Sequence, residues 1–335
     1  DGGLTLETVI IQNVLSENTD GNGNISADHP LFVAAKAISM GKLVAFPTET
    51  VYGLGANALD PEAVKKIYDV KGRPGDNPLI VHVHEKDIIK SLVKEISPYA
   101  KILMDNFMPG PITLIFNKNP VIPDEITAGL DTVAIRIPSH KTALIFLEAC
   151  GLPVAAPSAN ISGRPSPTSL KHVLSDLDGK VDYIIDGGYC EVGVESTVVD
   201  TTGDYPVILR PGFITKTQID DACKNVKNSN TVKLSSYDSE KSKNSTPKSP
   251  GMKYRHYAPD AQVYIKADSN FEIQIKEALN LVKRAEGDKK KLGIFSSDEF
   301  KRKVESQISI EEKDRIHFIT FGSEGDIKSA LSLLF

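Results

Sequence analysis

The stretch Thr132-Val133-Ala134-Ile135-Arg136-Ile137-Pro138 has the pattern of a β-strand whose two faces differ in chemistry. Successive side chains of a strand point to opposite faces, so one face carries Val133, Ile135 and Ile137, and the other carries Thr132, Ala134 and Arg136. If the apolar face lies in the core, Arg136 stands on a face that is wet or filled by a ligand, because burying an unpaired guanidinium is costly. Arg136 is therefore a candidate clamp for a carboxylate or phosphate, with a paired structural arginine as the alternative.

Short apolar strands recur on both sides of this stretch. We expect them at 43–46, 78–84, 112–116, 154–156, 182–185, 196–200 and 207–209. Between them we expect helices at about 30–41, 60–72, 86–107, 140–150, 168–177 and 215–225. Asp60 and Pro61 are typical of a helix start and Gly72 of a helix end. This mixture of strands and helices predicts an α/β (mixed α+β) domain of about 200 residues.

The remaining length indicates more than one domain, because 335 residues exceed the roughly 100–150 that one domain usually holds. From Gln262 onward strands and helices alternate, which predicts a smaller, parallel, Rossmann-like α/β domain. We expect an N-terminal extension at 1–29, a catalytic domain at 30–223, a flexible linker or lid at 224–259, and the Rossmann-like domain at 260–335. The last of these is expected to be cut short at Phe335.

Composition narrows the functional class. The net charge of −5 argues against a protein coated in basic charge for duplex DNA. Three widely spaced cysteines, Cys150, Cys190 and Cys223, indicate neither a disulfide scaffold nor a zinc site. No run of about 18 uncharged apolar residues occurs, so no membrane contact is predicted. We expect a cytoplasmic enzyme; a leader lost before Asp1 and an organelle-targeted form are alternatives that stay open.

Common nucleotide and metal motifs are absent or out of context. The sequence has no P-loop and no G-x-S-x-G elbow. Gly53-Leu54-Gly55-Ala56-Asn57-Ala58 matches G-x-G-x-x-A, but this loop does not open a helix. His82-Val83-His84 places two imidazoles on one face of a strand without a third ligand at a known spacing. We therefore predict no dedicated metal site, and these residues alone favour a structural role for His82.

Polar groups gather instead in the loops that follow strands and helices. In the loop Lys71–Pro78, the end of a helix explains Lys71 and Gly72 but leaves Arg73 and Asn77 unexplained. Two cations in a loop constrained by Gly and Pro suit a polyphosphate. Other candidate segments are Ala155–Asn160, Arg164–Thr168, Glu195–Thr197 and Leu209–Gly212. Each of these is weak evidence by itself.

Taken together and in order, these segments resemble the YrdC-like proteins, which are threonylcarbamoyl-adenylate synthases. The segments that carry the resemblance are Phe46–Leu54, Lys71–Val83, Pro109–Pro111, Arg136–Pro138, Ser158–Asn160, Gly193–Thr197 and Leu209–Gly212. Pro250–Pro259 is similar to the interdomain linker of the longer, two-domain form. The resemblance implies a twisted open sheet flanked by helices for the larger domain.

The resemblance also implies a reaction. Members of the family are nucleotidyltransferases (adenylyltransferases) that combine L-threonine, bicarbonate and ATP into threonylcarbamoyl-adenylate and pyrophosphate. Mg²⁺ is expected to accompany ATP as cofactor. The product is handed to a tRNA threonylcarbamoyl transferase, which modifies the adenosine next to the anticodon.

Site residues carried over from the family form three sets. The K-x-R…S-x-N catalytic signature falls on Lys71, Arg73, Ser158 and Asn160. Threonine contacts fall on Thr50, His82, Arg136, the backbone at Ala156, and Ser196. ATP contacts fall on Arg73, Asn77, Thr132, Ser158, Ser166, Arg210 and Tyr257. The resemblance thus implies that His82 contacts the substrate, whereas the residues alone favoured a structural role.

Two other functions stay open at this point. Residues 224–256 hold eight Lys/Arg and two Asp/Glu, a net charge of +6, so the linker could make a weak contact with tRNA or another RNA. Its composition is also that of a solvated tether, which we favour. Carbamoyl transfer onto another protein is the second alternative; the sequence has no acylphosphatase or zinc-finger pattern that would accompany it.

Overall fold

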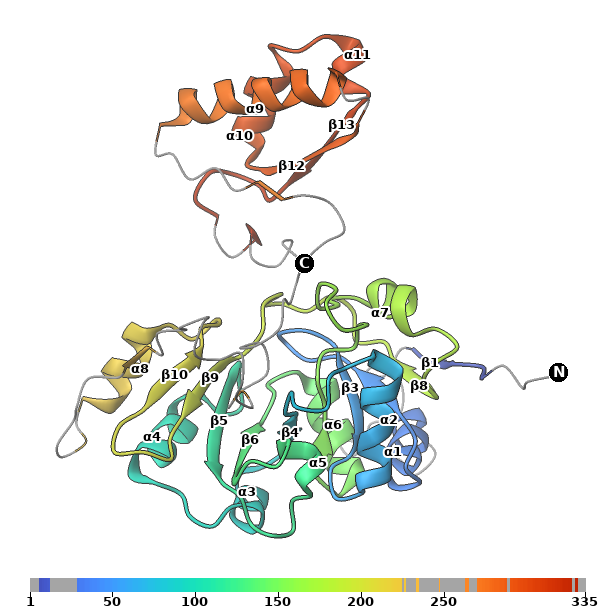
Figure 1. Cartoon of the computed structure of the whole chain (residues 1–335), viewed down its shortest axis with the longest axis vertical. Helices are drawn as coiled ribbons and strands as arrows, with labels where there is room; N and C mark the ends of the chain where they lie inside the picture. The colour runs from blue at the N-terminus through green and yellow to red at the C-terminus, as the bar shows by residue number, and fades with distance from the viewer. Residues whose placement is uncertain are drawn as a thin grey trace. The chain divides into compact units, whose positions relative to one another are not determined.

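The computed structural model describes residues 6–12, 29–224, 226, 233–234, 247, 263–264, 270–287, 290–326 and 329–330. The chain divides into two compact units, Asp1–Ala258 and Pro259–Phe335 (Figure 1). Tyr257 and the Pro250–Pro259 segment lie outside the described residues, so the predictions made for them are not addressed by the structure. No described helix is long and apolar enough to cross a lipid bilayer.

The larger unit is built on a mixed sheet of eleven described strands. Their order across the sheet is β1 (Val9–Ile11), β8 (Tyr183–Ile185), β2 (Val44–Phe46), β3 (Gly53–Asn57), β7 (Val154–Ala155), β4 (Ile80–His82), β6 (Thr132–Arg136), β5 (Ile112–Asn117), β9 (Thr197–Asp200), β10 (Val207–Arg210) and β11 (Lys233–Leu234). Strand β4 is parallel to β6, whereas β5 is antiparallel to β6. Helices flank this sheet, so the predicted mixed α/β fold class is confirmed (Figure 1).

The helices of this unit are α1 (Pro30–Ser39), α2 (Pro61–Lys71), α3 (Lys86–Leu92), α4 (Pro98–Phe107), α5 (Asp124–Thr127), α6 (Lys141–Cys150), α7 (Leu170–Leu177) and α8 (Lys216–Cys223). Apart from α5, which was not predicted, and the pair α3 and α4, they begin and end close to where the sequence predicts. The Asp60 side chain caps α2 by accepting from the Glu62 amide, and Gly72 ends the helix in the left-handed region at φ 58°.

The prediction of one continuous helix over 86–107 is wrong. Helix α3 ends at Leu92, and Val93 forms an isolated β-bridge with Lys118. A second helix, α4, then starts at Pro98, with the Ser97 hydroxyl accepting from the Ala100 amide. Proline favours the first position of a helix and removes a donor from a helix interior, so the break falls where Ser97 and Pro98 permit a new start.

The two faces predicted for 132–138 are both present. Val133, Ile135 and Ile137 are buried in the largest apolar cluster. Ala134 lies in a separate cluster with Ile80, Ile115 and Val198. Arg136 follows Ala134 on this second face and is the last residue of β6. The alternation thus brings a guanidinium to the end of the strand, away from the main core.

The smaller unit contains α9 (Phe271–Gly287), β12 (Leu292–Ser296), α10 (Asp298–Glu305), α11 (Ile310–Lys313) and β13 (Ile316–Thr320). Strands β12 and β13 pair in parallel, with Leu292 opposite Ile316. Ile275, Ala278 and Val304 form its buried core. A parallel pair with an intervening helix is the arrangement predicted for a Rossmann-like domain. The first expected strand, at 262–266, lies mostly outside the described residues.

Candidate active site

A pocket opens where several strands of the large sheet end together. Strand β4 ends at His82 and β6 ends at Arg136, and their parallel pairing places these two residues side by side. Strand β9 begins at Thr197, directly after Glu195 and Ser196, and pairs with the start of β5. Two strands thus finish and a third begins around one pocket, which is open to solvent. Small-molecule sites are concave and carry a few convergent polar groups, and this pocket has both features.

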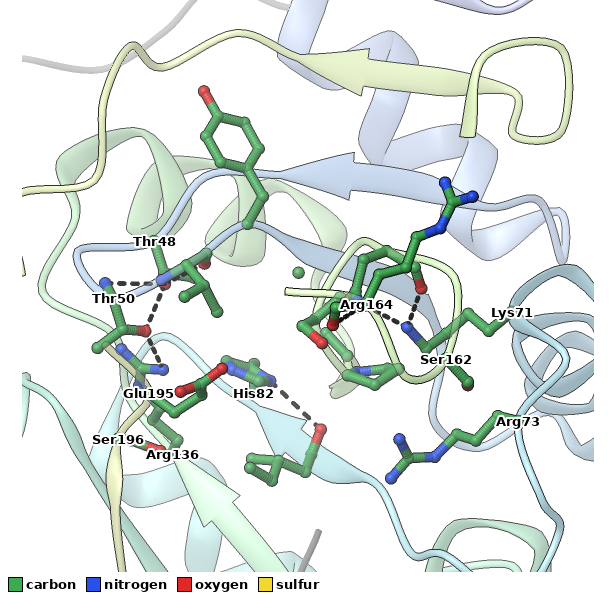
Figure 2. Close-up of a pocket in the computed structure, with 18 of the residues that line it drawn as sticks. Thr48, Thr50, Lys71, Arg73, His82, Arg136, Ser162, Arg164, Glu195 and Ser196 are labelled. Atoms are coloured by element: carbon green, nitrogen blue, oxygen red, sulfur yellow. Dashed lines mark hydrogen bonds between the residues drawn. The ribbon is translucent and has the colours of Figure 1, made fainter. Parts of the chain in front are cut away.

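Most of the predicted site residues line this pocket. Those that do are Thr50, Lys71, Arg73, His82, Arg136, Ala156, Ser158, Asn160, Ser196 and Arg210. Figure 2 labels several of the lining residues, which fall in two groups with His82 between. We call the group of Thr50, Arg136, Glu195 and Ser196 the Arg136 end, and the group of Lys71, Arg73, Ser162 and Arg164 the Lys71 end.

Arg136 is buried and surrounded by partners. Its Nη2 lies 2.7 Å from Glu49 Oε1. The two groups form an ion pair, although the angles between them fall outside hydrogen-bond geometry. Its Nη1 donates to Thr50 Oγ1 at 2.8 Å, and Thr50 Oγ1 in turn lies 2.9 Å from Thr48 Oγ1. Arg136 and Glu49 are only 4% and 5% exposed, so the carboxylate compensates the guanidinium charge in a place that water scarcely reaches. The guanidinium is thereby held in one orientation.

His82 is neutral in this environment. Burial, together with the neighbouring Arg136 charge, lowers the pKa of His82 to about 3. Its Nδ1 lies 3.3 Å from the Ile80 carbonyl oxygen, and a neutral ring that donates this bond keeps its lone pair on Nε2. The edge of the ring meets Phe46, with ring centroids 5.9 Å apart. His82 can therefore accept a hydrogen bond at Nε2 but supplies no positive charge.

At the Lys71 end, three of the four residues predicted as the catalytic signature, Lys71, Ser158 and Asn160, contact one another directly. Lys71 is the last residue of α2, is 1% exposed, and donates from Nζ to the carbonyl oxygens of Ser158, at 2.6 Å, and Asn160. Burial, with a further contribution from Arg73, lowers the pKa of Lys71 well below its ordinary value. The ammonium group thus ties the loop of Ser158–Asn160 to α2.

Two further arginines are held by backbone carbonyls. Arg73 donates from Nε to the Asn77 carbonyl at 3.1 Å and from Nη2 to the Pro78 carbonyl at 2.9 Å. Arg210 donates from Nε and Nη2 to the Ser196 carbonyl at 3.2 and 3.0 Å, and from Nη2 to Ser196 Oγ at 3.1 Å. These bonds fix the direction of each guanidinium, and a guanidinium held in this way is suited to binding an anion.

Close backbone packing supports the loop that follows Arg210, the last residue of β10. At Gly212, a Cβ atom would lie 2.5 Å from both the Glu195 carbonyl oxygen and the Thr197 nitrogen. Only glycine fits at this separation. The loop after β10 therefore lies directly against the segment that precedes β9.

Three predicted residues do not line the pocket. Thr132 starts β6 and lies four steps along the strand from Arg136, about 13 Å at 3.3 Å per residue. Asn77 is 1% exposed, and its carbonyl, rather than its side chain, meets Arg73. Ser166 reaches the pocket through Glu195, because Ser166 Oγ donates to Glu195 Oε1 at 2.5 Å. The ATP contacts assigned to these residues stay predictions.

The pocket also contains residues to which the sequence analysis assigned no contact, although several of them lie in segments that it singled out. They are Thr48, Val51, Tyr52, Gly53, Ile80, Pro157, Ser162, Gly163, Arg164 and Glu195. Arg164 is joined to the catalytic loop, because Asn160 Nδ2 donates to its carbonyl oxygen at 2.8 Å. The sequence feature that could have identified Arg164 is its position four residues after Asn160, in a Gly-Arg-Pro turn. The sequence feature that could have identified Glu195 is its position directly before Ser196, which was predicted to contact threonine.

Two family models together match most of the chain. The Sua5–YciO–YrdC model, described as "Telomere recombination", matches residues 36–212. The model described as "Threonylcarbamoyl-AMP synthase, C-terminal domain" matches residues 214–335. The chain belongs to the Sua5 family. The resemblance to the two-domain form, inferred from the sequence, is thus confirmed.

Relatives within the Sua5 family cover most of the chain. The threonylcarbamoyl-AMP synthase of Pyrococcus abyssi is 48% identical over 268 residues, which span 80% of this chain and 76% of that protein. The threonylcarbamoyl-AMP synthase of Bacillus subtilis is 44% identical over 282 residues, which span 84% of this chain and 78% of that protein. The crystal structure of P. abyssi Sua5 complexed with L-threonine superposes with a TM-score of 0.82 at 40% identity, covering 98% of this chain and 87% of that one.

Proposed function

We propose that this chain is a threonylcarbamoyl-AMP synthase, an adenylyltransferase that joins L-threonine, bicarbonate and ATP and releases pyrophosphate. The observation that carries the proposal is one pocket with two kinds of cationic group. At one end Arg136 is compensated and oriented by Glu49, and at the other Lys71 and Arg73 are held by backbone carbonyls. Membership of the Sua5 family and the synthase names of its relatives support the same function.

The Arg136 end suits an amino acid with a side-chain hydroxyl. The Arg136 guanidinium would bind the carboxylate of threonine, since a fixed fork of N–H donors matches that group. The neutral His82 would accept a hydrogen bond at Nε2 from the threonine hydroxyl. The Ala156 amide already donates to the Ile80 carbonyl, so Ala156 has only its own carbonyl oxygen to offer the substrate.

The Lys71 end suits the phosphates of ATP. Arg73, with Arg210 across the pocket, would neutralise charge that develops while a carbamate oxygen attacks the α-phosphorus and pyrophosphate leaves. Lys71 would act through the Ser158–Asn160 loop, because both of its described partners are carbonyl oxygens of that loop. No covalent enzyme intermediate is required, so catalysis would consist of positioning and charge stabilisation.

Mg²⁺ fits this pocket as a companion of ATP. The described residues contain no group of three or more Asp, Glu, His or Cys side chains that could cage a metal ion. Mg²⁺ binds readily through phosphate oxygens and retained waters with one or two carboxylates. When bound with ATP it would supply positive charge to the phosphates.

We further propose that the product is passed to a tRNA threonylcarbamoyl transferase. The test of the proposed function is pyrophosphate release from ATP at fixed Mg²⁺, with and without L-threonine and bicarbonate. We expect release that requires both co-substrates and is much slower with serine. Release that ignores threonine would contradict the proposed function and would favour the alternative of RNA binding.

A further inference from the structure

Glu195 is the negatively charged side chain of a pocket that is otherwise cationic. Among the described residues that line it, the cationic side chains are Lys71, Arg73, Arg136, Arg164 and Arg210. Glu49 compensates Arg136 but is not itself part of the pocket wall. A carboxylate in such surroundings needs an explanation, because its negative charge would repel an anionic ligand and weaken binding in a pocket that binds only anions.

Glu195 is held in place by a buried hydroxyl. Ser166, which is 1% exposed, donates from Oγ to Glu195 Oε1 at 2.5 Å. No other described side chain donates a hydrogen bond to this carboxylate. One oxygen is therefore anchored, and the group keeps further capacity to accept from a ligand.

The sheet brings Glu195 to the end of the pocket where Arg136 and His82 lie. Strand β9 starts two residues after Glu195, and Thr197 pairs with Ile112 of β5. Strand β5 pairs in turn with β6, which ends at Arg136. Figure 2 shows Glu195 together with Arg136 and Ser196 at one side of the pocket, next to His82.

An amino acid brings a second charged group to this end. Arg136 accounts for its carboxylate, but the α-ammonium group would be repelled by the surrounding cations. The ammonium group must also lose a proton before nitrogen can form a bond to carbon. His82 is already committed, since its Nδ1 faces the Ile80 carbonyl oxygen and its Nε2 is assigned to the threonine hydroxyl. Lys71 already directs its ammonium group to two carbonyl oxygens.

We propose that Glu195 binds the α-ammonium group of threonine and accepts the proton that this group loses when the carbamate forms. The proposal rests on the proposed function of the chain. One N–H bond of the ammonium group breaks, the proton moves to a Glu195 oxygen, and the electron pair stays on nitrogen. The resulting amine and bicarbonate then give the carbamate and one water molecule. Glu195 afterwards releases its proton to solvent, which reaches the open pocket.

The first test measures threonine binding without turnover. Calorimetry at neutral pH would compare threonine with 3-hydroxybutyrate, which keeps the carboxylate and the hydroxyl but lacks the amine. We expect Glu195→Gln to weaken threonine binding by about tenfold, a typical loss for a charge-assisted hydrogen bond, and to leave 3-hydroxybutyrate binding unchanged. Glu191→Gln removes the same charge from an exposed position in the same loop and should change neither. An equal loss for both ligands in Glu195→Gln would overturn the proposal.

The second test follows pyrophosphate release against pH. Glu195→Gln should lower kcat/KM for threonine by about 100-fold at neutral pH, as expected for loss of a general base. The deficit should shrink as pH rises and threonine itself becomes a free amine. A deficit that is constant with pH, or one that added Mg²⁺ removes, would overturn the assignment, the latter by showing that Glu195 binds metal. Absence of threonine-dependent release in the unmodified chain would instead contradict the proposed function, and the binding test would still decide the role of Glu195.

Discussion

The two ends of the pocket hold a buried cation in different ways. Arg136 lies against the carboxylate of Glu49 and donates to the hydroxyl of Thr50. Lys71 is equally buried, but its described partners are the carbonyl oxygens of Ser158 and Asn160. A side-chain counter-ion compensates charge, whereas backbone acceptors couple the cation to the conformation of a loop. Removing Arg136 should therefore impair recognition of one substrate, and removing Lys71 should alter the shape of the site.

The largest effect is expected from Lys71→Met. The substitution leaves two buried carbonyl groups without their donor and releases the Ser158–Asn160 loop, so kcat/KM should fall at least about 100-fold for ATP and threonine alike. Steady-state pyrophosphate release measures this, and thermal unfolding should show a stability loss of about 1–3 kcal/mol. Lys65→Met, at an exposed position of the same helix, is the matched control. A loss confined to ATP would mean that Lys71 acts on phosphate directly.

Arg136→Ala should have a narrower effect. We expect kcat/KM for threonine to fall at least about tenfold, or 1.4 kcal/mol, while the KM for ATP changes little. The physical reason is the loss of the carboxylate fork with the Lys71 end left intact. Titrating each substrate at saturation of the other separates the two effects. An equal loss of kcat/KM for threonine and for ATP would show that the Arg136 end does not act on threonine alone.

The burial of a neutral His82 predicts that the free energy of unfolding depends on pH. Its folded pKa of about 3 lies below its ordinary value, so the unfolded chain binds the proton more tightly. Stability from neutral His82 is present above its ordinary pKa near 6.5 and is lost as pH falls from there toward 3, by up to about 1.4 kcal/mol per pH unit. Chemical denaturation of the unmodified chain and of His82→Gln between pH 7 and pH 5 measures the difference. Parallel pH profiles would show that His82 is not buried neutral.

The smallest expected effect is that of Ser166→Ala. Because the Ser166 hydroxyl donates to Glu195, its loss should raise the KM for threonine by a few-fold, about 0.5–1 kcal/mol, through a less well oriented carboxylate. The KM for ATP should stay near normal. Ser175→Ala, at an exposed position of α7, provides the control. A rise in the KM for ATP instead would place Ser166 at the nucleotide, as the family resemblance implied.

The sequence was most informative where local rules apply. Alternation in 132–137 correctly separated the core face from the face that leads to Arg136. Alternation places Thr132 and Arg136 on one face, but they lie at opposite ends of the strand. Only the end with Arg136 meets the pocket, and alternation could not show this. The family resemblance identified Lys71 and Asn160 as one signature, but their contact through a carbonyl depends on how the end of α2 meets the loop after β7. Glu49 and Glu195 meet Arg136 and Ser166 only through tertiary contacts, which local sequence patterns do not show.

Gly212 has a consequence for how the site can move. The loop after β10 touches residues 195–197 with no room for a methyl group, and Arg210, the last residue of β10, hydrogen-bonds to Ser196. The two segments are therefore packed without space between them. If Arg210 binds phosphate as proposed, a displacement of Arg210 would act on Ser196 through their hydrogen bond, and binding of the nucleotide would be felt by the groups that face the amino acid.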